Sequence, residues 1–216
     1  GYKNHAIRLK NIIQEIGDYD IYNFNYHINP ESDLKDADAY IISTPNETHL
    51  EWIKKLTPYK KYIFCEKPPV TKLSDLEKIR HYSDKLYFNF NYRFSYLSNI
   101  LSEFNNTREL GAPIYINCVS THGIAFNSSF KKNWRFSNKN ILSSIVGNLG
   151  IHYIDLIYYL FGRIENIDLK YLSIVSPELP DTCKMTLKMR DSFCDILLSY
   201  AAPFVNNISV LYDDGI

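Results

Sequence analysis

The chain has 216 residues, with 24 basic and 24 acidic side chains, so its formal net charge is zero. This balance excludes a general nucleic-acid binder, which needs an excess of Lys and Arg. Hydrophobic residues make up 45% of the chain, enough for the core of one large or two small domains.

Three functional classes receive no support from the sequence. The four cysteines have no metal-ligand spacing, so we expect no metal site: Cys65, Cys118, Cys183 and Cys194. We expect buried or incidental thiols in a reducing compartment, the cytoplasm. No secretory signal is visible at the start of the chain. The most apolar run, residues 153–161, is too short to cross a membrane, so we expect no membrane partner.

The first part of the chain alternates between helix-like and strand-like segments. Helical spacing of apolar residues predicts helices at residues 3–16, 47–56 and 73–82, the last with Ser74 as its N-cap. Short apolar or alternating runs predict strands at residues 20–24, 39–43, 61–65 and 86–91. Such alternation is typical of a doubly wound parallel sheet. We predict a Rossmann-like α/β dinucleotide-binding domain over residues 1–92.

After Arg93 the pattern changes. Helices are predicted at residues 96–104 and 144–161, and strands at residues 113–121, 167–175, 182–189, 193–201 and 208–212. Consecutive strands after a helix favour an open, mainly antiparallel sheet with helices on one face. We therefore predict an α+β domain over residues 93–216. It would bind substrate and form a homo-oligomer, a dimer or tetramer, through the open sheet.

The turn after the predicted strand 39–43 carries polar side chains that suit a dinucleotide: Ser43, Thr44, Pro45, Asn46 and His49. Dinucleotides bind at the carboxyl ends of parallel strands, where hydroxyls and amides can bond ribose and phosphate oxygens. The alternative is an ordinary turn with Asn46 as a helix cap. We expect His49 to pack or cap rather than react.

A second turn, Glu66-Lys67-Pro68, follows the predicted strand 61–65. A lysine at a strand exit can bond a substrate hydroxyl and favour the alkoxide that precedes hydride loss. The alternative is a solvated lysine in a loop ended by proline.

The predicted helix 144–161 carries Asn148, His152 and Asp155 at spacing i, i+4, i+7, hence on one face. Histidine titrates near neutrality, so it can take a hydroxyl proton as hydride leaves or return it in reduction. The alternative is a structural histidine.

Together these motifs resemble the signature of the glucose-fructose oxidoreductase / inositol dehydrogenase / MocA family. The resemblance implies a nicotinamide cofactor, NAD or NADP, and a sugar-like small-molecule substrate: a sugar, a polyol or a nucleotide-linked sugar. It implies that Lys67 and His152 are catalytic and face one crevice. It also implies that Glu66 lies near the nicotinamide ribose, often beside a cis peptide at Pro68.

The resemblance extends to four further features. Asn148 is expected to bind substrate; it stands where the family usually has a carboxylate, and an amide can orient a group but cannot take a proton. Arg93 is expected to contact substrate or the other domain, and the alternative is a plain salt bridge. The pair Trp134-Arg135 is expected to border the substrate pocket, and the alternative is simple packing. Asp155 is expected to orient His152, to contact substrate or to position its helix.

The start of the chain matches the end of the family's glycine-rich turn, with Gly1 as a cofactor-binding residue before His5-Ala6. We therefore expect the chain to be part of a longer protein. The choice between NAD and NADP stays open, because Asn25 and Tyr26 stand where an acidic ribose-binding residue is expected. Two other functions also stay open: a noncatalytic cofactor-binding or regulatory relative, and a reductase of a non-sugar carbonyl or imine.

Overall fold

The structure, a computed structural model, describes residues 4–24, 31–127, 145–175, 177 and 179–215. The chain divides into two compact units, Gly1–Asn89 and Phe90–Ile216. Each unit has its own core of buried hydrophobic residues. The boundary between the units lies three residues before the boundary predicted from the sequence, and each unit is described by itself.

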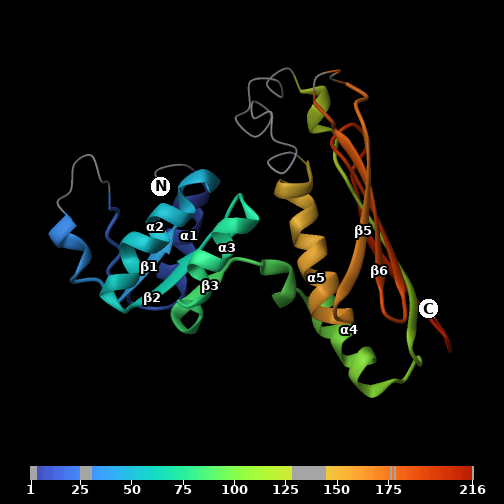
Figure 1. The fold of residues 1–216 in the computed structure, drawn as a ribbon, viewed down its shortest axis with the longest axis horizontal. Coiled ribbons are helices and arrows are strands. Elements are labelled where there is room, and N and C mark those ends of the chain that lie inside the picture. The colour runs from blue at the N-terminus through green and yellow to red at the C-terminus, as the bar shows by residue number, and fades with distance from the viewer. Residues whose placement is uncertain (1–3, 25–30, 128–144, 176, 178, 216) are drawn as a thin grey trace. The chain divides into compact units, whose positions relative to one another are not determined.

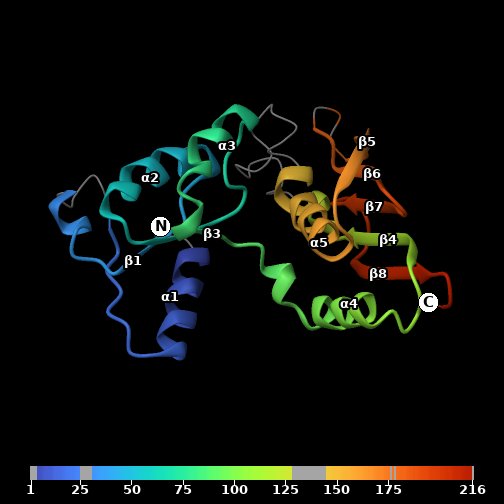
Figure 2. The ribbon, with the colours of Figure 1, turned by 60° about the horizontal axis from the view of Figure 1, so that its bottom comes forward.

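The first unit is built on a parallel sheet in the order β1 (Ala39–Ile42), β2 (Tyr62–Cys65), β3 (Leu86–Phe88). Its helices are α1 (Asn4–Ile16), α2 (His49–Leu56) and α3 (Leu73–Arg80). Figure 1 shows α2 and α3 beside the strands, and Figure 2 shows α1 on the other side of the sheet. The predicted Rossmann-like arrangement is confirmed.

The core of this unit follows the burial pattern of its strands. Tyr40 and Ile42 of β1 are buried, and they cluster with Ile63 of β2, Ile53 of α2 and Ile79 of α3. Because successive side chains of a strand point to opposite faces, every second residue of β1 enters this core. The helices that connect the parallel strands supply the rest of it.

Three local predictions for this unit are wrong. Residues 20–24 form no strand, because an alternating pattern gives a strand only where a neighbour supplies ladder hydrogen bonds. Ser74 lies inside α3, whose N-cap position is Lys72, without a side-chain cap bond. The third strand ends at Phe88, because residues Asn91–Phe94 form a 3₁₀ turn, η5.

The second unit is built on a five-stranded sheet in the order β5-β6-β7-β4-β8. The strands are β4 (Pro113–Thr121), β5 (Ile164–Leu172), β6 (Thr182–Met189), β7 (Phe193–Ser199) and β8 (Val205–Tyr212). Neighbouring strands are antiparallel except for the parallel pair β4 and β7. The predicted open, mainly antiparallel sheet is confirmed.

Helices α4 (Tyr96–Thr107) and α5 (Ile151–Phe161) supply the other half of this core. Figure 2 shows α5 along one face of the sheet, where its fully buried Tyr153 and Ile157 join Met185, Ile196 and Leu198 of the strands. The opposite face of the sheet keeps every second residue of β6 and β7 more exposed. The sheet therefore buries one face against the helices.

The start of the predicted helix 144–161 differs from a regular α-helix. Val146–Gly150 is a π-helical turn, in which the Ile151 N–H reaches back to the Val146 carbonyl. At Gly150 a Cβ would lie 3.0 Å from Leu198 Cδ1 and 3.2 Å from Met185 Cε. A larger residue at this position would require the ends of these two side chains to shift, so the turn approaches the sheet closely here. Single π turns are rare in proteins overall, and many of those that occur lie at functional sites.

Candidate active site

In the first unit, the segments that follow the three strands lie at one edge of the sheet. The Glu66 N–H donates to the Ile42 carbonyl and the Asn89 N–H donates to the Cys65 carbonyl, both at 2.9 Å. Ladder hydrogen bonds therefore continue one residue beyond β2 and β3. Because carboxyl ends of parallel strands share an edge, Ser43-Thr44, Glu66-Lys67 and Asn89 lie at that edge.

The Glu66 carboxylate is held by two donors from different parts of the unit. Its Oε1 lies 2.7 Å from Asn89 Nδ2, just past β3, and 2.7 Å from His5 Nε2 on α1. The side chain is only 12% exposed. These bonds fix the carboxylate beside the peptide Lys67–Pro68, which is cis, as the resemblance implied.

The buried side chain of His49 links the loop after β1 to the loop after β2. Its side chain is fully buried, with Nδ1 2.8 Å from the Pro68 carbonyl oxygen and Nε2 3.1 Å from the Thr44 carbonyl oxygen. A ring enclosed in this way holds the loops that follow β1 and β2 and does not present itself to a ligand. The expected packing role fits this geometry, and we assign His49 to positioning in place of direct cofactor contact.

The polar side chains of the turn after β1 are partly exposed to solvent. Ser43, Thr44 and Asn46 are half-buried. Thr48 Oγ1 donates to the Pro45 carbonyl at 2.8 Å and lies 2.7 Å from Thr44 Oγ1. The alternative role of Asn46 as a helix cap is wrong, because Pro45 occupies the N-cap position and no side chain caps this turn.

These residues fit a nicotinamide dinucleotide. Two hydroxyls, one amide and one carboxylate gather at the carboxyl edge of a parallel sheet, and such groups bond ribose and phosphate oxygens. Ser43, Thr44 and Asn46 would hold the cofactor from the first loop and Glu66 from the second. The predicted cofactor-binding residue Gly1 lies outside the described residues.

In the second unit, α5 and the π turn carry the candidate acid–base group. Asn148 and His152 are both half-buried, and the His152 ring stacks on Tyr92 of η5, with ring centroids 4.8 Å apart and 23° between planes. Tyr92 also meets the edge of Tyr153, at 5.4 Å and 89°. The imidazole therefore lies against an aromatic pair.

Arg93 and Asp155 form a bidentate pair. Arg93 Nε donates to Asp155 Oδ2 at 2.7 Å, and Nη2 donates to Oδ1 at 2.5 Å. The hydrogen bond to Asp155 raises the pKa of the Arg93 guanidinium above its ordinary value. Both residues were predicted to contact substrate. In the structure each binds the other, which matches the salt bridge left open for Arg93 and the helix-positioning role left open for Asp155. Their contact with substrate stays a prediction.

Other predicted features fall outside these observations. Trp134 and Arg135 lie outside the described residues. The prediction that Lys67 and His152 face one crevice stays a prediction, because they belong to different units. The four cysteines are free thiols and all are buried, the first of the two alternatives predicted for them. In the described ranges, no helix has the length and apolarity to span a membrane.

Three residues of the candidate site were not predicted from the sequence: His5, Asn89 and Tyr92. Asn89 could have been found, because it follows the third parallel strand and so shares an edge with the other two turns. Tyr92 directly precedes Arg93, which was predicted to contact substrate. The contact of His5 with a residue 61 positions away leaves no local signal.

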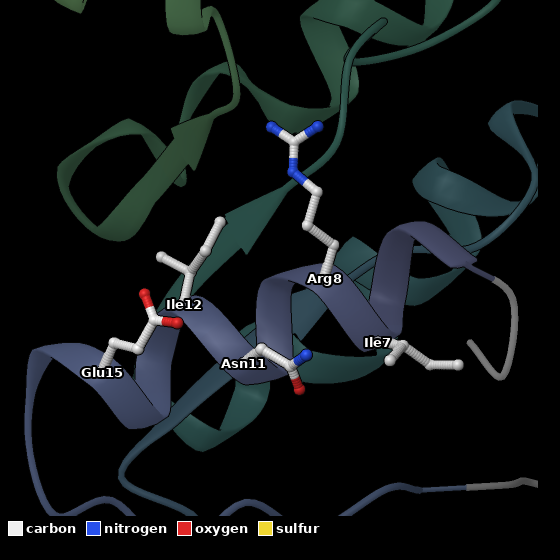
Figure 3. Close-up of a pocket in the computed structure, with 5 residues that line it drawn as sticks. All are labelled: Ile7, Arg8, Asn11, Ile12 and Glu15. Atoms are coloured by element: carbon white, nitrogen blue, oxygen red, sulfur yellow. The ribbon is translucent and has the colours of Figure 1, made fainter.

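A shallow depression of about 450 Å³ runs along α1 and is lined by Ile7, Arg8, Asn11, Ile12 and Glu15. Figure 3 shows these side chains spreading outward from a single helix. All five are exposed, and none belongs to the predicted site. The depression is an open helix flank, and it is not the candidate active site.

Comparisons with known proteins support the geometry. Residues 18–87 match the profile described as oxidoreductase family, NAD-binding Rossmann fold, and residues 101–216 match that of the GFO/IDH/MocA C-terminal domain. Glucose-6-phosphate 3-dehydrogenase of Bacillus subtilis (strain 168) is 30% identical over 130 residues, which cover 58% of this chain and 37% of that protein. The matched part of this chain spans less than half the length of the curated relatives.

Two solved structures share the fold at low sequence identity. Myo-inositol 2-dehydrogenase from Lactobacillus plantarum has a TM-score of 0.75 at 20% identity, over 87% of this chain and 59% of that chain. An oxidoreductase from Agrobacterium radiobacter, solved with NAD⁺, L-tartaric acid and magnesium, has a TM-score of 0.75 at 17% identity, over 97% and 63%.

The two family profiles follow the two units in order. The first profile describes an NAD-binding fold and covers the three parallel strands, so the predicted cofactor class, NAD or NADP, is confirmed. The second covers more than half of the chain, from α4 to its last residue. The chain therefore belongs to the GFO/IDH/MocA family of oxidoreductases.

Proposed function

We propose that the protein transfers hydride between a nicotinamide cofactor, NAD or NADP, and a CH–OH carbon of a sugar, polyol or nucleotide-linked sugar. The observation that carries this proposal is the gathering of three polar strand ends around Glu66, beside Lys67. Relatives named for glucose 6-phosphate and myo-inositol support the substrate class.

Lys67 and His152 divide the proton chemistry in this proposal. The Lys67 ammonium donates to the substrate hydroxyl and stabilises the negative charge that develops on its oxygen. His152 takes the hydroxyl proton in oxidation and returns it in reduction. The bound cofactor supplies the hydride acceptor or donor. In oxidation the alcohol carbon loses a hydride and its oxygen a proton, which leaves a carbonyl.

The amide at Asn148 leaves open two alternative functions, which the experiment must distinguish from the proposed one. Its amide stands four residues before His152, where the resemblance implies a carboxylate. Without that carboxylate the protein could bind cofactor and no longer turn over, as a regulatory relative. It could also reduce a non-sugar carbonyl or imine, whose acceptor atom an amide N–H can bond.

The first experiment is titration of the intact protein with NADH and with NADPH, followed by fluorescence. Glucose 6-phosphate, myo-inositol and a nucleotide-linked sugar are then offered with the oxidised cofactor, and formation of NAD(P)H is followed by absorbance. We expect binding of at least one cofactor and turnover of one sugar-like substrate. Binding without turnover supports the regulatory alternative, and binding of neither cofactor overturns the oxidoreductase proposal.

We also propose that the protein forms a homo-oligomer through the face of the five-stranded sheet that points away from α5. Exposed apolar side chains lie on this face, on β7 and β8: Phe193, Leu197 and Leu211. Light scattering should give a dimer or tetramer that Leu197→Lys dissociates. The matched control Leu73→Lys, at an exposed leucine of α3, should leave the assembly intact.

A further inference from the structure

We propose that Tyr92 is a positioning residue that sets the plane of the His152 imidazole. This inference rests on the proposed function, in which His152 moves the substrate proton. Tyr92 lies on η5, outside the helix that carries His152, and the two rings are nearly parallel at 4.8 Å. Stacking of this kind favours one ring orientation over those that turn the imidazole away.

The turn that carries Tyr92 is itself fixed. The Tyr92 carbonyl accepts from the Ser95 N–H at 3.2 Å and from Ser95 Oγ at 2.8 Å. Ser95 is the N-cap of α4, where its Oγ accepts from the Ser98 N–H at 3.1 Å. The backbone at Tyr92 is thus tied to the first turn of α4, so its ring is presented from a rigid base.

A second contact holds η5 against α5 one turn further along. Arg93, the next residue of η5, makes the bidentate pair with Asp155, whose side chain is only 10% exposed. Its guanidinium also lies 5.1 Å from the centre of the Tyr159 ring. His152, Asp155 and Tyr159 follow one helix face at spacings of three and four residues. Two consecutive residues of η5, Tyr92 and Arg93, therefore contact two successive turns of α5.

The other edge of the aromatic pair connects to the sheet. Tyr153 packs edge-on against Tyr92 and is fully buried, and its hydroxyl donates to Asn206 Oδ1 of β8 at 2.8 Å. The Tyr92 ring thus contacts both the imidazole and a side chain fixed on the sheet. A side chain that served only to fill the core would not need to lie parallel to His152.

The test compares Tyr92→Phe, which keeps the ring, with Tyr92→Leu, which removes it. The readout is the ¹H–¹³C spectrum of the intact protein, with the His152 ring signals assigned by their loss in His152→Gln. We expect the ring current of residue 92 to shift these signals upfield in the wild type and in Tyr92→Phe. In Tyr92→Leu they should move toward the positions of an unstacked histidine.

Kinetics supply the second readout. Tyr92→Leu should lower kcat about fivefold to tenfold, as expected for loss of one stacking contact, with KM and NAD(P)H affinity changed less than twofold. Tyr92→Phe should keep at least half of the wild-type kcat. The matched control Tyr96→Leu, at an exposed tyrosine of α4, should behave as wild type. If Tyr92→Leu does not fold, Tyr92→Met takes its place at similar length.

The outcomes separate the two proposals. Unchanged His152 signals in Tyr92→Leu, or equal shifts in the Phe and Leu variants, overturn the positioning role whatever the activity is. Turnover of no substrate by the wild type defeats the proposed function, while the spectra still decide whether Tyr92 orients the imidazole. An equal loss of kcat in both variants would assign the effect to the phenol hydroxyl and overturn the role of the stack.

Discussion

The candidate site residues of the first unit lie at strand ends, whereas those of the second unit lie on a helix face. In the first unit, backbone bonds of the sheet place Glu66 and Asn89, and buried His49 joins two loop carbonyls. In the second unit, side chains place the site, through the Tyr92 stack and the Arg93–Asp155 pair.

Because of this difference, the two units should be sensitive to substitution at different kinds of position. The loops after β1 and β2 are held through carbonyl oxygens, so they should tolerate changes of most of their own side chains. Glu66 is the exception, because Asn89 and His5 hold its carboxylate. A helix face held by side-chain contacts loses its geometry when one contact is removed.

Lys67→Ala and His152→Ala should each lower kcat by about 10²–10⁴-fold, as expected for loss of a general acid–base group or an electrostatic partner. Affinity for NAD(P)H should change far less. If the two units serve one reaction, the double variant should lose less than the product of the single losses. Independent, multiplicative losses would contradict a shared proton transfer. The exposed Lys188→Ala supplies the control.

His49→Ala should lower the free energy of unfolding by about 2–4 kcal/mol, because it leaves a cavity and removes the ring N–H that a loop carbonyl accepts. Affinity for NAD(P)H should fall about tenfold as the loops after β1 and β2 separate, which corresponds to about 1.4 kcal/mol. Urea unfolding and cofactor titration measure both effects. The exposed His81→Ala should change neither, and an unaltered His49→Ala protein would refute the joining role.

Arg93→Met should destabilise the second unit by about 1–3 kcal/mol, because it leaves the Asp155 carboxylate mostly buried without its cation. Hydrogen exchange should accelerate in α5 and stay unchanged in α2. The double variant Arg93→Met/Asp155→Leu should recover part of the loss, since no buried charge remains. Equal acceleration in both units would contradict a loss of stability confined to the second unit.

Asn148→Asp should change kcat/KM about tenfold, the value of one charge-assisted hydrogen bond. If Asn148 replaces a lost catalytic carboxylate, the acid should raise activity or move the pH profile. If the amide donates to substrate, KM should rise, because a carboxylate cannot donate. Steady-state kinetics across pH distinguish the two results. An unchanged rate, KM and pH profile would place Asn148 outside the site.

Asp195→Asn should produce the smallest effect, about 1 kcal/mol. Partial burial raises the pKa of the Asp195 carboxyl, but bonds from Thr186, Lys184 and Tyr115 outweigh it and hold the pKa below its ordinary value of 3.8. The charged carboxylate therefore stabilises the fold above about pH 4, and this contribution is lost as pH falls through the lowered pKa. Unfolding curves of variant and wild type should converge in acid and separate at neutral pH.

Local pattern determined the types of element and the layer each one joins. Consecutive strand-like runs that include residues 182–189 and 193–201 predicted an open sheet with helices on one face, and the strand–helix alternation before residue 90 predicted a parallel sheet. The polar turns after β1 and β2 were found because strand ends of a parallel sheet share an edge. Each of these features depends on residues that are close together in the chain, so the local pattern of apolar and polar residues is enough to predict it.

Tertiary structure decided the pairings. The contacts of Glu66 with His5 and of Arg93 with Asp155 span 61 and 62 residues, and no local period encodes either partner. The π turn at Val146–Gly150 arises where a glycine meets the sheet, and the parallel pair β4 and β7 depends on strands far apart in the chain. A periodic pattern states which side chains are buried. Only the packed core decides which groups they meet there.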